Sequence, residues 1–184
     1  MRKKIPDFYI PYYDLIMKYY EEVSENILNH RNVNLENIYW YLVLGRYLNV
    51  RIADVKYAKD IYEFVTRCEM RDQDKVGFKF SPYAKQKVPD VWSTAFALVI
   101  LKLLGRLKDY FLTRRHERLK EKILKFIKSC KIKGVYRHCT DNCKICKRTS
   151  NFRTLFSVFE ALLILEPDFR KYKEEFAADF YLKN

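Results

Sequence analysis

The chain has 184 residues, a length that suits a single domain, because one hydrophobic core usually serves chains of up to roughly 250 to 300 residues. Its 49% hydrophobic and 16% aromatic content excludes intrinsic disorder. With only 4 Gly and 5 Pro, a β-fold built on tight turns is disfavoured. No apolar run approaches the roughly 20 residues of a membrane-spanning helix, and no apolar stretch follows the basic N-terminal residues as in a secretory signal. We therefore expect one all-α domain over residues 1–184, in the cytoplasm and without a membrane span.

The net charge of +13 is concentrated in one part of the chain. Residues 106–153 contain 16 Lys and Arg against four acids, which gives +12. Such an excess predicts either a solvated helix face or a docking surface for an anionic partner such as RNA or DNA.

Apolar residues recur at helical spacing in seven segments, most of which begin at an Asp or Asn suited to helix capping. The first predicted helix covers residues 12–29. The others are predicted at residues 34–48, 54–70, 90–104, 108–130, 151–165 and 168–182. Short loops and no strands are expected between them.

The predicted helix at residues 108–130 is amphipathic, with four cations opposite its apolar stripe. These are Arg114, Arg118, Lys122 and Lys125. A surface that met phosphates here would also include Lys144, Lys147 and Arg148 of the following loop. No recognised RNA-binding motif accompanies these residues, so an ordinary charged face is an equal alternative.

One sequence pattern occurs three times, which predicts a helical-hairpin repeat. Its second and third copies align Thr94 with Thr154, 60 residues apart, and a degenerate copy at Ile38 lies 56 residues before the first of these. Linkers that open at Gly77 and Gly134 precede the second and third copies, and the second linker is three residues longer. The repeat units are expected at approximately 34–76, 77–133 and 134–184.

The stretch GFKFSPYAKQKVPDVWSTAFALVILKLLG, residues 77–105, resembles the repeat of protein prenyltransferase β-subunits and of terpenoid (squalene) cyclases. The resemblance implies an α/α toroid, in which inner helices surround an apolar cavity, with Asp90, Trp92 and Phe152 on the cavity side. The resemblance also implies about twelve helices for a complete toroid. About seven helices therefore imply a partial toroid that is open, truncated, or completed by a second chain or by a homodimer.

Two departures from these families bear on activity. Prenyltransferases hold a catalytic zinc partly through Asp-x-Cys, whereas the equivalent residues here, Asp90-Val91-Trp92, lack the thiol. Cyclases protonate their substrate with a run of the Asp-x-Asp-Asp type, and the nearest run, residues 72–75, ends in Lys75. We therefore predict no catalytic residue and interpret Asp90 as a helix cap. The favoured function is a non-catalytic module that binds an apolar, isoprenoid-like ligand or a partner protein. The alternatives are a nucleic-acid-associated basic protein and a residual prenyltransferase or cyclase enzyme.

Three cysteines in one loop, Cys139, Cys143 and Cys146, have spacing typical of a zinc site. The fourth ligand is open between His138, Cys130, His116 and a water molecule. Four protein ligands would make the zinc structural, whereas a bound water could act as a nucleophile. We favour the structural role, because Asp141 is the only carboxylate in the loop. Unligated thiols are the alternative to a metal. An iron–sulfur cluster with the same cysteine spacing is disfavoured, because no barrel strand precedes the motif.

Overall fold

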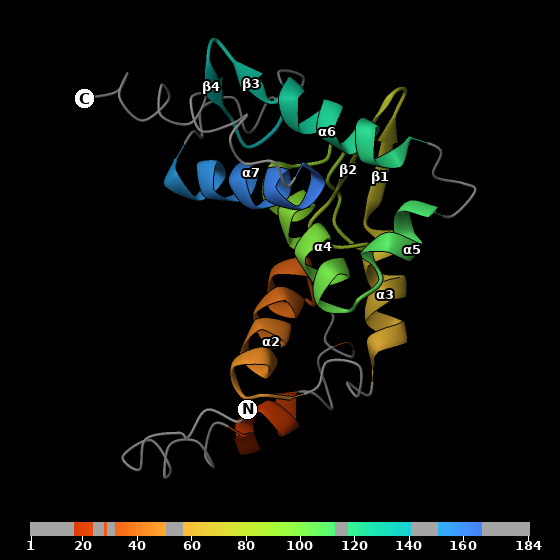
Figure 1. Cartoon of the computed structure of the whole chain (residues 1–184), viewed down its shortest axis with the longest axis vertical. Helices are drawn as coiled ribbons and strands as arrows, with labels where there is room; N and C mark the ends of the chain where they lie inside the picture. Colours follow the sequence, from red (N-terminus) through yellow and green to blue (C-terminus); the bar gives the residue numbers. More distant parts are fainter. Residues whose placement is uncertain are drawn as a thin grey trace.

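The computed structural model describes residues 17–23, 28, 32–50, 57–112, 118–140 and 151–166 (Figure 1). Residues 17–23 are helical. The helices that follow are α2 (Leu35–Tyr47), α3 (Ala58–Arg67), α4 (Val91–Leu103), α5 (Leu107–Leu112), α6 (Leu119–Ser129) and α7 (Phe152–Leu165). The strands are β1 (Glu69–Asp72), β2 (Lys75–Phe78), β3 (Lys131–Ile132) and β4 (Val135–Tyr136). The predicted helix at 168–182 lies outside the described residues.

Helices α2, α4 and α7 begin where the sequence predicted, because each has a side-chain cap at the expected residue. The side chains of Asn34, Asp90 and Asn151 each accept a hydrogen bond from the backbone amide three residues on, at 3.0, 2.7 and 2.9 Å. Each bond satisfies one amide that has no partner inside its helix. The all-helical repeat fold is confirmed in these segments.

The prediction that no strands occur was wrong. Strands β1 and β2 form one antiparallel hairpin and β3 and β4 form a second, so the predicted helix at 54–70 is shortened to α3. Both turns use left-handed backbone: φ is 48° at Gln73, 52° at Lys133 and 81° at Gly134. Strands of two to four residues are too short to show an alternating pattern, which is why the sequence concealed them.

The predicted helix at 108–130 was also wrong as a single element. Helix α5 ends at Leu112 and α6 begins at Leu119. Arg118, directly before α6, has a φ of 56°, which is left-handed backbone that an α-helix does not contain. The apolar stripe that the sequence showed is real, since Leu119, Ile123 and Ile127 are buried on α6.

Helix α4 is the centre of the fold, with α2 packed on one side and α7 on the other (Figure 1). Ala95, Ala97 and Leu98 are among its fully buried residues. Helix α6 packs on β2, and α3 lies beside α4 beneath the first hairpin. A helix that is apolar on nearly every face, as α4 is, must be buried on nearly every side. Helices α2, α4 and α7 are called the inner helices below.

The same backbone hydrogen bonds occur in successive repeats. Lys79 N donates to Cys68 O and Arg137 N donates to Cys130 O, both at 2.9 Å. The start of α2 is bound by Phe80 O, which accepts from Leu35 N at 3.0 Å. In the same way, the start of α4 is bound by the carbonyl of His138. Each long linker therefore fastens the inner helix of the preceding repeat.

These bonds also correct the repeat alignment. Lys79 matches Arg137, so Gly77 corresponds to Val135 and not to Gly134. Gly134 serves the hairpin turn, whereas a Cβ on Gly77 would lie 2.6 Å from the Cβ of Pro89. The three-residue difference between the linkers persists when it is measured from hairpin to cap: Asp90 follows Lys79 by 11 residues, and Asn151 follows Arg137 by 14.

Candidate functional site

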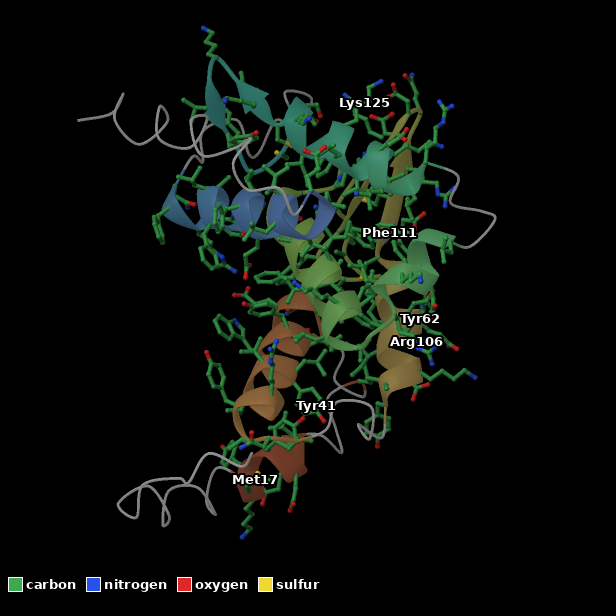
Figure 2. All side chains as sticks on the ribbon, in the orientation of Figure 1. Met17, Tyr41, Tyr62, Arg106, Phe111 and Lys125 are labelled. Atoms are coloured by element: carbon green, nitrogen blue, oxygen red, sulfur yellow. The ribbon has the colours of Figure 1, made fainter. Side chains whose placement is uncertain are left out.

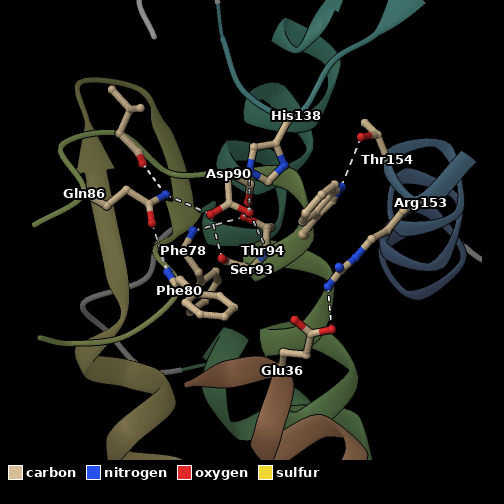
Figure 3. Close-up of polar contacts among 12 residues, drawn as sticks. Glu36, Phe78, Phe80, Gln86, Asp90, Ser93, Thr94, His138, Arg153 and Thr154 are labelled. Carbon is tan, nitrogen blue, oxygen red and sulfur yellow. Dashed lines mark hydrogen bonds and ion pairs between the residues drawn. The ribbon is translucent and has the colours of Figure 1, made fainter. Parts of the chain in front are cut away.

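The carboxylate of Asp90 is occupied by hydrogen bonds (Figure 3). Oδ1 accepts from the Ser93 amide at 2.7 Å, and Oδ2 accepts from the Ser93 hydroxyl at 2.6 Å and from the Gln86 side-chain amide at 2.8 Å. Asp90 is 4% exposed. Both oxygens thus serve the start of α4 and the linker before it, which is the chemistry of a buried helix cap.

Trp92, the second residue of α4, is covered by side chains of α7. Its Nε1 donates to Thr154 Oγ1 at 3.1 Å. The guanidinium carbon of Arg153 lies 4.1 Å from the centre of the indole ring, a cation–π contact. Arg153 Nη2 continues to Glu36 Oε1 of α2 at 2.5 Å. One arginine therefore joins the N-terminal ends of all three inner helices (Figure 3).

His138 closes the same cluster from the linker after the second hairpin. Its ring centre lies 4.2 Å from that of Trp92, and its Nε2 lies 3.7 Å from Asp90 Oδ1. The pKa of His138 is lowered, first by burial and further by Arg153, against the opposing effect of Asp90. The imidazole is thus held neutral at pH 7, and its buried Nδ1 has no hydrogen-bond partner within the described part of the chain.

The residues at the start of α4 do not fit the catalytic zinc that the family resemblance implies. An indole supplies no metal ligand in place of the missing thiol, and a guanidinium lies over that indole. The carboxylate of Asp90 is already shared among three donors. No chemical step through a zinc ion at this position follows from the structure.

A second feature, an apolar groove of about 450 Å³, lies between the inner helices toward their C-terminal ends. Its apolar walls are Val99 and Leu103 of α4 and Leu163 and Ile164 of α7. Trp92, Phe96, Val99 and Leu103 share one face of α4, because they are spaced at i, i+4, i+7 and i+11. The groove therefore continues the face on which the Trp92 cluster lies.

Three charged residues complete the lining of the groove: Arg46, Lys102 and Glu160. Burial raises the pKa of the Glu160 carboxyl.

The candidate zinc ligands are only partly described. Cys143, Cys146 and His116 lie outside the described residues, whereas Cys139 is described and is 2% exposed. Cys130 is fully buried, and burial raises the pKa of its thiol to about 12. It occupies the same repeat position as Cys68, which favours a packing role over metal ligation. Within the described residues, no group of three or more His, Cys, Asp or Glu is placed to hold a metal ion.

The predicted basic face is only partly described, and one of its described cations is paired with an acid. Arg114, Lys144, Lys147 and Arg148 lie outside the described residues. Lys125, which Figure 2 labels on α6, forms an ion pair with Asp74 in the turn of the first hairpin. That contact also places the acidic run at residues 72–75 at a hairpin tip beside α6, away from the groove. Arg118 precedes α6 and Lys122 lies on it.

Of the predicted cavity residues, Asp90 and Trp92 meet in one cluster, whereas Phe152 does not belong to it. Phe152 is 73% exposed and stacks on Phe156 of the same helix, with ring centres 6.5 Å apart. Sequence reasoning missed Arg153 and Glu36, which complete the cluster. They are 117 residues apart, and no spacing rule connects them.

None of the helices that the structure describes combines the length and the apolar character needed to cross a bilayer. Residues 12–180 match a family model described as the prenyltransferase alpha-alpha toroid domain. Comparison of the chain with curated proteins and with solved structures gave no match.

Proposed function

Because this chain belongs to the prenyltransferase alpha-alpha toroid family, we propose that it uses the toroid architecture as a non-catalytic module that binds an apolar, isoprenoid-like ligand. The observation that carries the proposal is the contrast between the two ends of the inner helices. At their N-terminal ends lie the positions at which related enzymes carry catalytic groups. Here these positions hold Asp90 and Trp92, whose polar atoms are hydrogen-bonded to neighbours, and Arg153 stacks on Trp92. At their C-terminal ends an apolar groove is open.

The loss of catalysis is supported by the chemistry of the first end. A ligand-binding or proton-donating carboxylate needs a free oxygen, and both oxygens of Asp90 accept short hydrogen bonds. The position that would hold a thiolate is the Trp92 indole. Neither a general acid nor a metal-activated nucleophile is assembled there.

Ligand binding is supported by the size and the lining of the groove. Its volume of about 450 Å³ falls within the roughly 300–1,000 Å³ typical of small-molecule sites. The four aliphatic side chains of Val99, Leu103, Leu163 and Ile164 favour a branched hydrocarbon chain. The charged groups at the groove offer partners to a polar end group.

The proposal is tested by titrating the full chain with a fluorescent isoprenoid alcohol. Leu163→Asp, which places a charge in the groove, is expected to weaken binding at least tenfold. Leu112→Asp is the matched control, because Leu112 is also exposed, at 70%, but does not line the groove. No saturable binding, or equal losses in both variants, would contradict apolar ligand binding. Turnover of an isoprenyl diphosphate by the wild-type chain would contradict the non-catalytic role.

We also propose a structural zinc ion held by Cys139, Cys143 and Cys146, with His138 as the fourth ligand. The support is the cysteine spacing, the buried position of Cys139, and the adjacent His138, whose buried Nδ1 has no hydrogen-bond partner within the described residues. Metal analysis of the purified chain should give about one zinc per molecule, and Cys143→Ser should lose it. Cys68→Ser is the control. Cys68 is a buried residue at the C-terminal end of α3 and is not part of the cysteine loop, so its substitution should leave the zinc content unchanged. Purified chain without zinc would exclude this site.

A further inference from the structure

The unpaired charges of the three inner helices all lie at the apolar groove. These helices carry two acids and three bases, which are Glu36, Glu160, Arg46, Lys102 and Arg153. Arg153 and Glu36 pair with each other near the N-terminal ends, at 2.5 Å. In the described part of the chain, the other three charged residues form no ion pair. Each of those three lines the groove at the C-terminal ends.

The two unpaired cations lie at the same level on neighbouring helices. Every inner helix contributes to the groove the residue that lies twelve positions after its cap. These residues are Arg46, Lys102 and Leu163. Helices α2 and α4 pack against each other, and packed helix axes lie about 8–10 Å apart. The long, exposed side chains of Arg46 and Lys102 can therefore reach one small anion between them. These two residues are called the cationic rim below.

The one acid of the groove lies away from this rim. Glu160 precedes Leu163 by three positions on α7, so it lies nearer the N-terminal ends of the helices. Its side chain is half-buried, whereas Arg46 and Lys102 are exposed. Because burial raises the pKa of the Glu160 carboxyl, its negative charge is disfavoured at that depth. The lining as a whole favours an anion at the rim over a cation.

The helix dipole explains only part of this arrangement. Arg46 and Lys102 lie in the last turns of α2 and α4, where a cation complements the negative end of the dipole. That effect requires a base in the last turn, but it does not select a side of the helix. In both helices the base occupies the side that lines the groove.

From the unpaired charges, the equal level of the two cations and the apolar walls beside them, we propose that the groove selects an apolar ligand with an anionic end group, a carboxylate or a phosphate. Arg46 and Lys102 hold the anion through charge-assisted hydrogen bonds. The hydrocarbon chain lies between α4 and α7, against Val99 and Leu163. This inference rests on the proposed binding of an isoprenoid-like ligand and names the end group that the site takes.

The test compares farnesol with farnesoic acid, which share one hydrocarbon chain and differ in the end group. Each is used at pH 7 to displace the fluorescent isoprenoid alcohol from the full chain. We expect the acid to bind about three- to tenfold more tightly than the alcohol, as two exposed ion pairs allow. Arg46→Gln and Lys102→Gln should each reduce this preference, and the double variant should abolish it. The preference should also shrink as the salt concentration rises.

Two further variants test the assignment of charge. Lys108→Gln is the matched control, because Lys108 is also an exposed lysine but does not line the groove, and it should leave the preference intact. Glu160→Gln removes the acid of the groove and should increase the preference for farnesoic acid. Circular dichroism of each variant checks that the fold is kept.

The outcomes separate this inference from the proposed function. If farnesol binds and Leu163→Asp weakens its binding, but the acid binds no more tightly, the anionic end group is wrong and apolar binding stands. If neither probe binds, both fail. A preference that survives in the double variant would place the anion elsewhere and overturn the inference. Probe binding that weakens as the chain concentration rises would show that a second copy occupies the groove in place of a ligand, which would overturn it too.

Discussion

Replacing Asp90 by alanine tests whether this carboxylate is a structural cap. The substitution removes one acceptor from the Ser93 amide and two further hydrogen bonds, from the Ser93 hydroxyl and the Gln86 amide. Losing a cap costs about 0.5–2 kcal/mol, and leaving a buried polar group unpaired costs about 1–3 kcal/mol. Ser93 is fully buried. We therefore expect Asp90→Ala to lower the free energy of unfolding by about 2–4 kcal/mol.

The matched comparison is Asn34→Ala, because Asn34 caps α2 through one hydrogen bond whose partners are exposed. That variant should lose only about 1 kcal/mol. For a chain of this size 1 kcal/mol corresponds to about 2–4 °C in Tm, so thermal unfolding followed by circular dichroism separates the two variants. Asp90→Asn keeps the cap oxygen and should fall between them. An Asp90→Ala variant as stable as Asn34→Ala would refute the network and leave Asp90 free for a chemical role.

Three further predictions concern buried groups. Gly77→Ala should destabilise the chain by about 1–3 kcal/mol in urea unfolding. The reason is that the added Cβ would lie 2.6 Å from Pro89 and 2.9 Å from the Phe126 ring. If Phe126→Leu does not reduce this loss in a double-mutant cycle, the assigned clash is wrong. Burial raises the pKa of Glu160 above its unfolded value, so the folded state binds the proton more tightly and stability falls as pH rises through these pKa values. Glu160→Gln should accordingly raise Tm at pH 7 but not at about pH 3, below the ordinary Glu pKa of about 4.3, and an equal gain at both pH values would contradict the burial effect. The Cys130 thiol, whose pKa burial raises to about 12, should react with a thiol reagent only after unfolding, and rapid labelling of the native chain at pH 8 would contradict its place in the core.

The role of a candidate site residue could be predicted where a single short segment contains every residue that the role requires. Asp90 could be interpreted as a cap because capping needs only the residue and the helix pattern after it. The hydrogen bond from Ser93 confirms that interpretation. The missing thiol at Trp92 was equally visible, because the motif occupies three consecutive residues.

Residues that act across the fold could not be predicted. Arg153 reaches Trp92 and Glu36 only because α7 and α2 flank α4. The groove depends on the same packing, since Leu163 and Val99 come from different helices. The hairpins were missed for a local reason, because two to four strand residues show no period and their stability comes from packing against α6.

By itself, the sequence determined the repeat, its helical character and the starts of the inner helices, because caps and apolar spacing are local properties that survive in any environment. It also determined the family resemblance and the loss of the thiol beside Asp90. The tertiary structure alone decided which residues meet at the capped start of α4 and which face of α4 opens into a groove. It also decided that Phe96 is buried while Trp40 and Phe156 are exposed. The physical reason is that exposure depends on the number of neighbouring helices, and equivalent residues in a repeat have different neighbours at its ends.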